Sequence, residues 1–284
     1  MNLKEKYVNP FTDFGFKKLF GTEPNKDLLI DFLNQIIPKS HTIKDLSYTS
    51  NEYLGYSDVD RKAIFDLFCT SEKGDKFIVE LQKAKQNYFK DRSIYYSTFP
   101  IQEQAIKGDW NYKLSAVFTV GILDFVFQED KQEKEVLHIV QLKDQNSEVF
   151  YDKLTYLYLE MPNFNKSEDE LETHFDKWLY VFKNLNRLEK IPAKLQDKVF
   201  KKLFNSAEVA KFTKNEREQY EESLKIYRDW KSITDTAFGE GKIEGKIEVA
   251  LVAIQNGLSD EMIVTLTGLS SQEINKLRHK PSTK

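Results

Sequence analysis

The chain of 284 residues has a single cysteine, Cys69, and this excludes an intrachain disulfide. Its first ten residues, MNLKEKYVNP, lack the apolar stretch of a secretory signal peptide. The longest apolar run, residues 116–127, is interrupted by Asp124 and is too short to span a bilayer. These absences predict a cytoplasmic protein with no membrane partner.

The chain also lacks an excess of positive charge. Its formal net charge is −3 at pH 7, so contact with nucleic acid needs a local cluster of basic residues or bound metal ions. Hydrophobic residues make up 40% of the chain and charged residues 31%, which is typical of a globular protein and not of a disordered one. The length suffices for one core of roughly 150 residues and an appendage.

The first 165 residues alternate between helical and strand patterns. A helical pattern at residues 87–107, kinked or split at Pro100, joins two predicted strands. A helix between strands predicts a crossover connection, which places the sheet in the α/β class. In chain order we expect helices at 13–20 and 27–37, a strand at 44–54, a hairpin at 64–82, the helix at 87–107, a buried strand at 113–127, a charged turn at 128–135 and a strand at 136–142.

From about Glu168 the pattern becomes helical throughout, with aromatic and charged residues at helical spacing. We therefore expect a sheet domain at 1–165, a helical region packed on it at 166–238, and a tail at 239–284. The tail opens with the tandem repeat EGKIEGKIE. This repeat favours either a linker helix or a helix for self-association, which would make the protein a homo-oligomer.

The last residues have the outline of a helix-turn-helix. Ser259 is expected to cap a helix that ends near Gly268, and Ser270 with Glu273 forms a capping box that opens another. Two short helices with a glycine turn match a helix-turn-helix that contacts DNA. A helical hairpin without a role in DNA binding fits the pattern equally well.

Two carboxylates are predicted to face each other across the hairpin at 64–82. The runs IFDLFCT and KFIVELQ flank the polar connector SEKGD, and each carries one carboxylate, Asp66 or Glu80. With the connector as the loop, Thr70 pairs with Lys76, and Asp66 lies opposite Glu80 at a Cβ distance of about 4.5–5.5 Å. Like charges so close need a cation between them or a proton on one. Magnesium binds one or two carboxylates together with phosphate oxygens, so the pair predicts half of a phosphodiester-cleaving site.

Strand alternation places Gln82 on the face of Glu80. Many nucleases have a lysine there, which orients water or stabilises charge on the phosphate. Glutamine can hydrogen-bond both groups, but it adds no positive charge. Lys62 shares the face of Asp66 by parity, if the strand extends that far, and is a candidate for the missing charge.

Further basic residues follow the hairpin and are candidates for phosphate contacts: Lys83, Lys85 and Arg92. Lys83 is expected on the face opposite Glu80. A carboxylate on a strand is often exposed, and basic residues often form a solvated surface. A plain interaction module with separate, exposed carboxylates is therefore the structural alternative.

The motifs together resemble the PD-(D/E)XK nuclease superfamily, and within it the recombination-promoting nuclease and transposase family. The resemblance covers most of the chain, and the order and spacing of its motifs are more specific than any single one. The motifs are DFGFKKLFG at 13–21, LLIDFLN at 28–34, Lys62-x-x-x-Asp66, VELQ at 79–82, RSIYY at 92–96 and the tail EGKIEGKIEVA at 240–250.

This resemblance implies a restriction-endonuclease-like αβββαβ core with a mixed sheet and a helical C-terminal region. It implies magnesium-dependent cleavage of DNA, with the metal carboxylates at Asp66 and Glu80. The lysine position of the motif falls on Gln82, and glutamine is usual there in this branch. Asp13 is a secondary candidate for an additional metal contact.

Our main hypothesis is a magnesium-dependent DNA endonuclease that acts in recombination or on mobile elements. Asp66, Glu80, Gln82 and Lys62 would form its catalytic site. The alternative is a DNA-binding or regulatory protein on a nuclease-like scaffold that is weak or inactive in catalysis. Salt-sensitive DNA binding that survives Asp66→Ala distinguishes the second hypothesis from the first.

Overall fold

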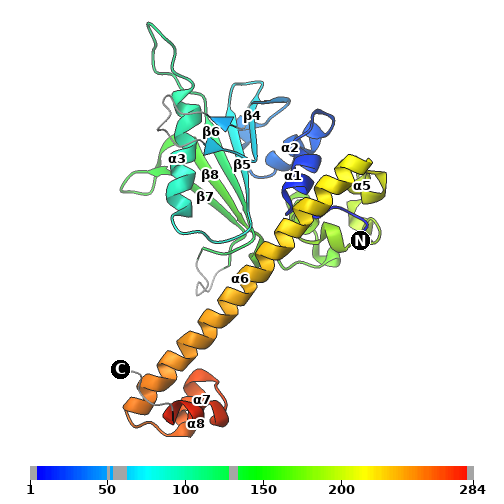
Figure 1. The fold of residues 1–284 in the computed structure, drawn as a ribbon. Coiled ribbons are helices and arrows are strands. Elements are labelled where there is room, and N and C mark those ends of the chain that lie inside the picture. The colour runs from blue at the N-terminus through cyan, green and yellow to red at the C-terminus, as the bar shows by residue number, and fades with distance from the viewer. Residues whose placement is uncertain (1–4, 50–51, 54–62, 128–133, 280–284) are drawn as a thin grey trace. The chain divides into compact units, whose positions relative to one another are not determined.

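The computed structural model describes residues 5–49, 52–53, 63–127 and 134–279 (Figure 1). The chain forms two compact units, Met1–Leu224 and Lys225–Lys284. The first unit contains the sheet and the helices packed on it. The second unit is helical and has its own small core.

A six-stranded mixed sheet forms the centre of the first unit, in the order β1-β4-β5-β6-β8-β7. The pairs β5–β6 and β6–β8 are parallel, and the other pairs are antiparallel. A separate two-stranded ribbon pairs β2 with β3. The strands are β1 Leu46–Tyr48, β2 Glu52–Tyr53, β3 Ala63–Ile64, β4 Leu67–Ser71, β5 Lys76–Gln82, β6 Val117–Leu123, β7 Leu137–Lys143 and β8 Val149–Glu160.

The predicted crossover is confirmed. Helix α3, Phe89–Gln102, joins β5 to the parallel strand β6 and contains Pro100 without ending there. The hairpin register is also confirmed, since Thr70 pairs with Lys76 and Leu67 with Val79. Strand β6 is buried along its whole length, as its continuous apolar pattern predicts.

One strand prediction needs correction, and one strand was not predicted. The expected strand at 44–54 is divided between β1 and β2, which belong to different sheets. The sequence pattern does not predict β8, the longest strand, which lies between β6 and β7. The first half of β8 is largely exposed and carries charged residues among its aromatic ones, so it lacks a clear alternation. The predicted turn at 128–135 lies mostly outside the described residues.

Helices cover the sheet from both sides. Figure 1 shows α3 on one side and α1, α2 and α5 on the other. An aromatic cluster joins Phe20 of α1, Phe32 of α2, and Trp178 and Phe182 of α4. These helices are α1 Asp13–Phe20, α2 Lys26–Leu33, α4 His174–Asn184 and α5 Lys198–Ala207. Short 3-10 helices lie at Glu23–Asn25, Lys39–His41, Met161–Asn163, Glu168–Glu170, Leu185–Arg187, Ala193–Leu195 and Val209–Lys211.

The helical prediction for the tail is confirmed. Helix α6, Lys214–Gln255, runs through the glycine repeat, and a Cβ atom at Gly241 or Gly245 would meet open space. Within the described residues, no helix combines the length and the apolar character that crossing a membrane requires.

The second unit ends with two short capped helices, α7 Asp260–Thr267 and α8 Ser271–Arg278. Ser259 caps the first, and Gly268 ends it with a φ of 64°. Ser270 and Glu273 form the predicted capping box. The second unit's core is Ala250, Ala253, Ile263, Leu269 and Ile274.

Candidate active site

The candidate site lies on the sheet face that α3 covers. Glu80 of β5 pairs with Gly121 of β6, which pairs with Tyr158 of β8, which pairs with His138 of β7. Paired residues point to the same face, so these four positions form one row across the sheet. Tyr158 Oη donates a hydrogen bond to Ser93 Oγ of α3 at 2.7 Å. The helix is thereby fixed above the row that contains Glu80.

Asp66 and Glu80 meet at the open end of the hairpin. Asp66 lies at a bend just before β4, and its backbone N–H donates to Glu80 Oε1 at 3.3 Å. Its own Oδ2 accepts a hydrogen bond from the backbone N–H of Leu81 at 2.7 Å. Asp66 therefore lies opposite Glu80, as predicted, although it is one residue before the start of β4. Strand β4 begins only at Leu67, and Lys62 lies outside the described residues.

Burial governs the electrostatics of this pair. Glu80 is only 9% exposed, and burial, followed by the negative charge of Asp66, raises its pKa to about 8. Burial also raises the pKa of Asp66. The hydrogen bond from the N–H of Leu81 and the positive charge of Lys83 act in the opposite direction and lower this pKa. Two such carboxylates are stable together when a proton or a cation neutralises them. A divalent cation meets this requirement, so the donor set fits a hard metal ion.

Gln82 and Arg92 extend the site toward α3. Gln82 Nε2 donates to Glu80 Oε2 at 3.3 Å, and Arg92 Nη2 donates to Gln82 Oε1 at 2.6 Å. The Arg92 guanidinium lies 5.7 Å from the ring centroid of Phe89 and 5.8 Å from that of Tyr96. A positive charge therefore adjoins the neutral amide. The motif RSIYY contains Arg92, but only the docking of α3 shows that it contacts Gln82.

Of the other predicted residues, Lys83 and Asp13 lie within electrostatic range of Asp66, whereas Lys85 contacts Phe127. Lys83 follows β5 and is half-buried. Burial lowers the pKa of Lys83, and the negative charges of Asp13 and Asp66 raise it. Asp13 lies in the first turn of α1 and forms an exposed ion pair with Lys17 at 2.9 Å. Lys85 Nζ donates to the backbone carbonyl of Phe127 at 2.9 Å, away from the carboxylate pair.

A small cavity adjoins Glu80 under α3. It measures about 10 Å³, close to the roughly 10–15 Å³ that one water molecule needs. Its lining includes Glu80, Arg92, Tyr96, Thr119 and Tyr158. Among the described residues, the buried Oγ1 of Thr119 has no hydrogen-bond partner. The sequence patterns do not mark Thr119, because it lies within an uninterrupted apolar strand.

The metal-binding capacity of the site rests on two carboxylates. In the parts of the chain that the structure describes, no group of three or more His, Cys, Asp or Glu side chains is arranged to hold a metal ion. Magnesium commonly takes only one or two protein carboxylates and completes its shell with waters and substrate phosphates. The pair of Asp66 and Glu80 is of this kind.

The mixed sheet, its crossover helix and the hairpin carboxylates define a restriction-endonuclease-like α/β fold. The sequence model of a protein family described as PD-(D/E)XK nuclease family transposase matches residues 10–237, which is most of the chain. The chain therefore belongs to this family, as its motifs predict. Members of the superfamily generally use divalent metal ions. No curated protein and no solved structure gave a significant match.

Proposed function

We propose that this chain is a magnesium-dependent DNA endonuclease that hydrolyses phosphodiester bonds. The observation that carries the proposal is the pair at the end of the hairpin: the buried Glu80 carboxylate accepts a hydrogen bond from the Asp66 backbone N–H, and the charge of the Asp66 side chain raises the pKa of Glu80. Membership of a nuclease and transposase family supports the same reaction. A divalent cation can neutralise the two carboxylates, and a phosphodiester substrate brings further oxygen ligands for that cation.

Asp66 and Glu80 would hold the metal. Magnesium, when bound, polarises the phosphate and lowers the pKa of a bound water so that it can attack at neutral pH. Leu81 N–H holds one oxygen of Asp66, and Gln82 holds one oxygen of Glu80. Both carboxylates are therefore oriented before any ligand arrives, which lowers the cost of assembling the site.

Gln82 and Arg92 would act as one unit. Arg92 binds the amide oxygen of Gln82, and this directs the Nε2 donor toward Glu80. The amide can position water, while the guanidinium supplies the charge that stabilises phosphate oxygens in the transition state. Lys83 adds a second cation within electrostatic range of Asp66. Lys62, Lys85 and Asp13 stay candidates for phosphate or metal contacts.

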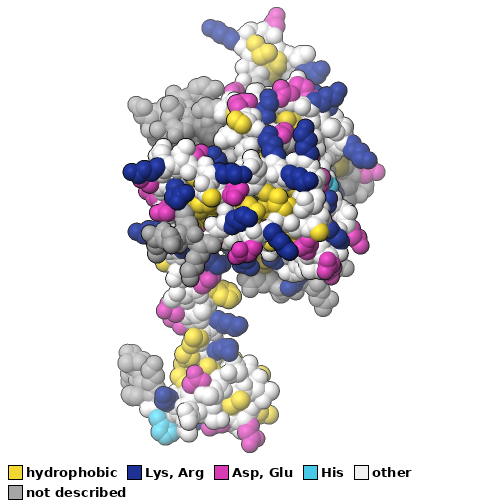
Figure 2. All heavy atoms as spheres, turned by 90° about the vertical axis from the view of Figure 1, so that its right-hand side faces the viewer, with side chains coloured by type: hydrophobic (Ala, Val, Ile, Leu, Met, Phe, Trp, Pro, Cys, Tyr) yellow, Lys and Arg dark blue, Asp and Glu magenta, His cyan; other side chains and the backbone are white. Residues whose placement is uncertain are grey.

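DNA binding in this proposal depends on local charge. On the face seen in Figure 2, Lys and Arg side chains lie among Asp and Glu side chains, in keeping with a net charge of −3. Such mixed surfaces produce little long-range attraction for a polyanion. The metal, Arg92 and Lys83 would supply the local positive charge.

A second candidate is a DNA-binding or regulatory protein with a weak nuclease site. The observation that favours it is the second unit, where the capped helices α7 and α8 share a core of their own. In this case DNA affinity, measured in EDTA at increasing salt, survives Asp66→Asn and falls when residues 239–284 are removed. Affinity that is unchanged by the truncation contradicts this candidate. Self-association through α6 and a cytoplasmic location stay predictions.

The endonuclease proposal is tested on closed circular plasmid. Wild-type protein is incubated with magnesium, with calcium or with EDTA, and nicked product is measured over time. We expect nicking in magnesium alone, because calcium binds oxygen ligands in a looser geometry. No nicking in magnesium, or equal nicking in EDTA, contradicts the proposal.

A further inference from the structure

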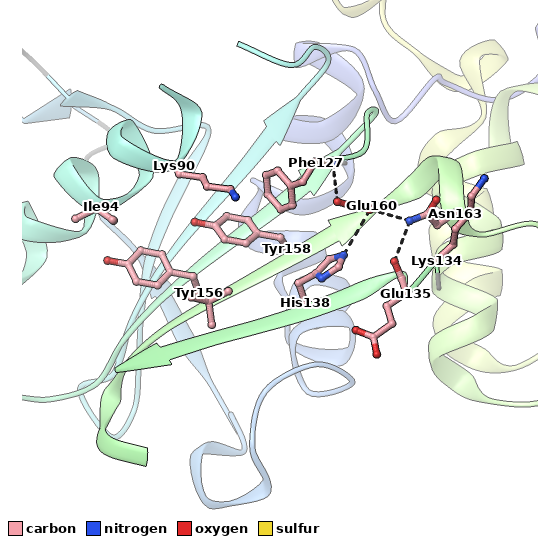
Figure 3. Close-up of a pocket in the computed structure, with 11 residues that line it drawn as sticks. Lys90, Ile94, Phe127, Lys134, Glu135, His138, Tyr156, Tyr158, Glu160 and Asn163 are labelled. Atoms are coloured by element: carbon pink, nitrogen blue, oxygen red, sulfur yellow. Dashed lines mark hydrogen bonds and ion pairs between the residues drawn. The ribbon is translucent and has the colours of Figure 1, made fainter. Parts of the chain in front are cut away.

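A larger cavity lies on the same sheet face, beyond Tyr158 from Glu80. Its volume of about 330 Å³ is at the lower end of the roughly 300–1,000 Å³ usual for small-molecule sites. Figure 3 shows its walls: Tyr156 and Tyr158 from β8, His138 from β7, Lys90 from α3 and Phe127 after β6. The carboxylate mechanism uses none of these side chains.

Aromatic rings form much of the lining. Phe127 lies edge-on to Tyr158 with ring centroids 5.3 Å apart, and Tyr156 lies parallel to Tyr158 at 6.2 Å. Lys90 Nζ is 5.0 Å from the centroid of Phe127. Ring faces of this kind accept a flat, unsaturated ligand, and stacking on aromatic side chains is how proteins hold unpaired nucleobases.

The rings are fixed in place by polar contacts. Tyr156 and Tyr158 are hydrogen-bonded to Ser97 and Ser93 of α3 at 2.8 and 2.7 Å. The backbone N–H of Phe127 donates to Glu160 Oε1 at 2.7 Å. The cavity is therefore built from positioned side chains, and a ligand would not have to order them.

The ring of His138 lines this cavity, and its Nε2 points toward Glu160 (Figure 3). Its Nε2 is 3.5 Å from Glu160 Oε2, and among the described residues this buried nitrogen has no hydrogen-bond partner. Glu160 is already engaged, since its Oε1 accepts from Phe127 and its Oε2 from Asn163 Nδ2 at 2.7 Å. The His138 ring lies edge-on to Phe127 with ring centroids 6.0 Å apart, and it therefore adds a flat surface to the lining.

The rim carries charge suited to phosphate. Lys90 and Lys134 line the cavity and are exposed, and its lining also includes the exposed Glu135 and the buried Glu160. Figure 3 shows Lys90 beside the aromatic rings and Lys134 at the other end of the cavity, beside Asn163. An ammonium group beside an aromatic lining matches a base with an attached phosphate, and Lys90 is in that position.

The cavity and the carboxylate site share a wall. Tyr158 lines both this cavity and the small one beside Glu80. Glu80 and Tyr158 lie in the same row, two strands apart, which corresponds to about 10 Å. A DNA strand with a phosphate at Glu80 can therefore place a neighbouring nucleotide over the larger cavity.

We propose that this cavity receives one unstacked nucleobase of the DNA strand, with the adjoining phosphate on Lys90. The base would lie among Phe127, Tyr156 and Tyr158, next to the ring of His138. The assignment of DNA as ligand rests on the proposed nuclease function. Enzymes that modify a DNA base hold the extruded base in a pocket of this kind, and such a pocket contributes base preference.

The test measures binding of the four deoxynucleoside monophosphates in EDTA, where no cleavage takes place. Titrations followed by NMR are compared for wild type, Val140→Trp and Ile139→Trp. Val140 lines the cavity, whereas Ile139 is 55% exposed on the opposite face of β7. We expect saturable binding with a preference among the bases, weakened at least about tenfold by Val140→Trp and unchanged by Ile139→Trp.

A second variant keeps the test independent of bulk. Lys90→Gln is expected to weaken nucleotide binding by about three- to tenfold, as the loss of one hydrogen bond to a charged group does. Absence of saturable binding in wild type, or equal binding by the two tryptophan variants, overturns the pocket assignment. Nucleotide binding without plasmid nicking would overturn the nuclease function alone.

Discussion

Arg92 Nη2 donates a hydrogen bond to Gln82 Oε1 at 2.6 Å, ten residues away in sequence and on a different element. The contact brings a guanidinium from α3 to the end of β5, where the superfamily motif has a lysine. A neutral residue at that position therefore does not leave the site without positive charge. The proposed division of roles is an amide that orients and an arginine that stabilises charge.

This division of roles predicts that the positive charge can be supplied from residue 82 in place of residue 92. Arg92→Gln should lower the single-turnover cleavage rate by about 10²-fold, as removal of one donor to a transition-state oxygen does. Adding Gln82→Lys to that variant should recover at least about tenfold, because the motif's charge returns. The control is Lys107→Gln, an exposed cation beyond α3. No recovery in the double variant contradicts the exchange.

The metal-free protein should be more stable at pH 5 than at pH 8. Burial, and then the charge of Asp66, raises the pKa of Glu80 from 4.5 to about 8 in the folded state. The folded state therefore binds this proton more tightly than the unfolded chain. The stabilisation is fully present below pH 4.5 and is lost as pH rises to about 8.

Glu80→Gln should reduce this dependence, because the amide does not titrate. Thermal unfolding in EDTA at pH 5, 6, 7 and 8 measures it, with the exposed Glu148→Gln as a matched control. The wild type and the control should lose stability over this range, and Glu80→Gln should lose less. Parallel curves for all three proteins would show that Glu80 titrates at its ordinary pKa.

Magnesium should stabilise the folded protein through the same pair. A ligand that binds only the folded state adds about 2.7 kcal/mol at one hundred times its Kd. At pH 8 the melting temperature of the wild type should therefore rise with magnesium by several degrees. Asp66→Asn should abolish the rise, while Asp152→Asn, on the exposed part of β8, should keep it. An equal rise in both variants places the bound ion elsewhere.

Gly121→Ala should disturb the wall between the two cavities. A Cβ atom there would lie 2.9 Å from Tyr158 Cδ1, so the tyrosine ring must move. Overpacking of a core costs roughly 1–3 kcal/mol, which urea denaturation detects. Gly241→Ala is the comparison, because a Cβ there meets open space and alanine favours a helix by about 1 kcal/mol. An unchanged urea midpoint for Gly121→Ala would contradict the tight packing of the Tyr158 ring against Gly121.

The hairpin could be predicted because its information is local. Apolar alternation and a five-residue polar connector fix the pairing of Thr70 with Lys76, and the position of Asp66 opposite Glu80 follows from it. The helical pattern between two strands predicted the crossover helix, and the family resemblance added the mixed sheet. Capping residues predicted α7 and α8 for the same local reason.

Contacts between distant elements could not be predicted in this way. Arg92 reaches Gln82 only because Ser93 and Ser97 bind Tyr158 and Tyr156 of β8. The sequence pattern does not predict β8, so neither that docking nor the larger cavity could follow from it. Thr119 similarly joins the site through the lateral register of β6 with β5.

The most direct test of the central claim compares Asp66→Asn with Asp152→Asn in the plasmid assay with magnesium. Both variants replace one carboxylate with an amide of the same shape, but of the two only Asp66 carries a charge that acts on Glu80. We predict that Asp66→Asn lowers the nicking rate by about 10²- to 10³-fold, as loss of a metal ligand does, while Asp152→Asn nicks at the wild-type rate. Equal nicking by the two variants would contradict a catalytic metal site at Asp66 and Glu80.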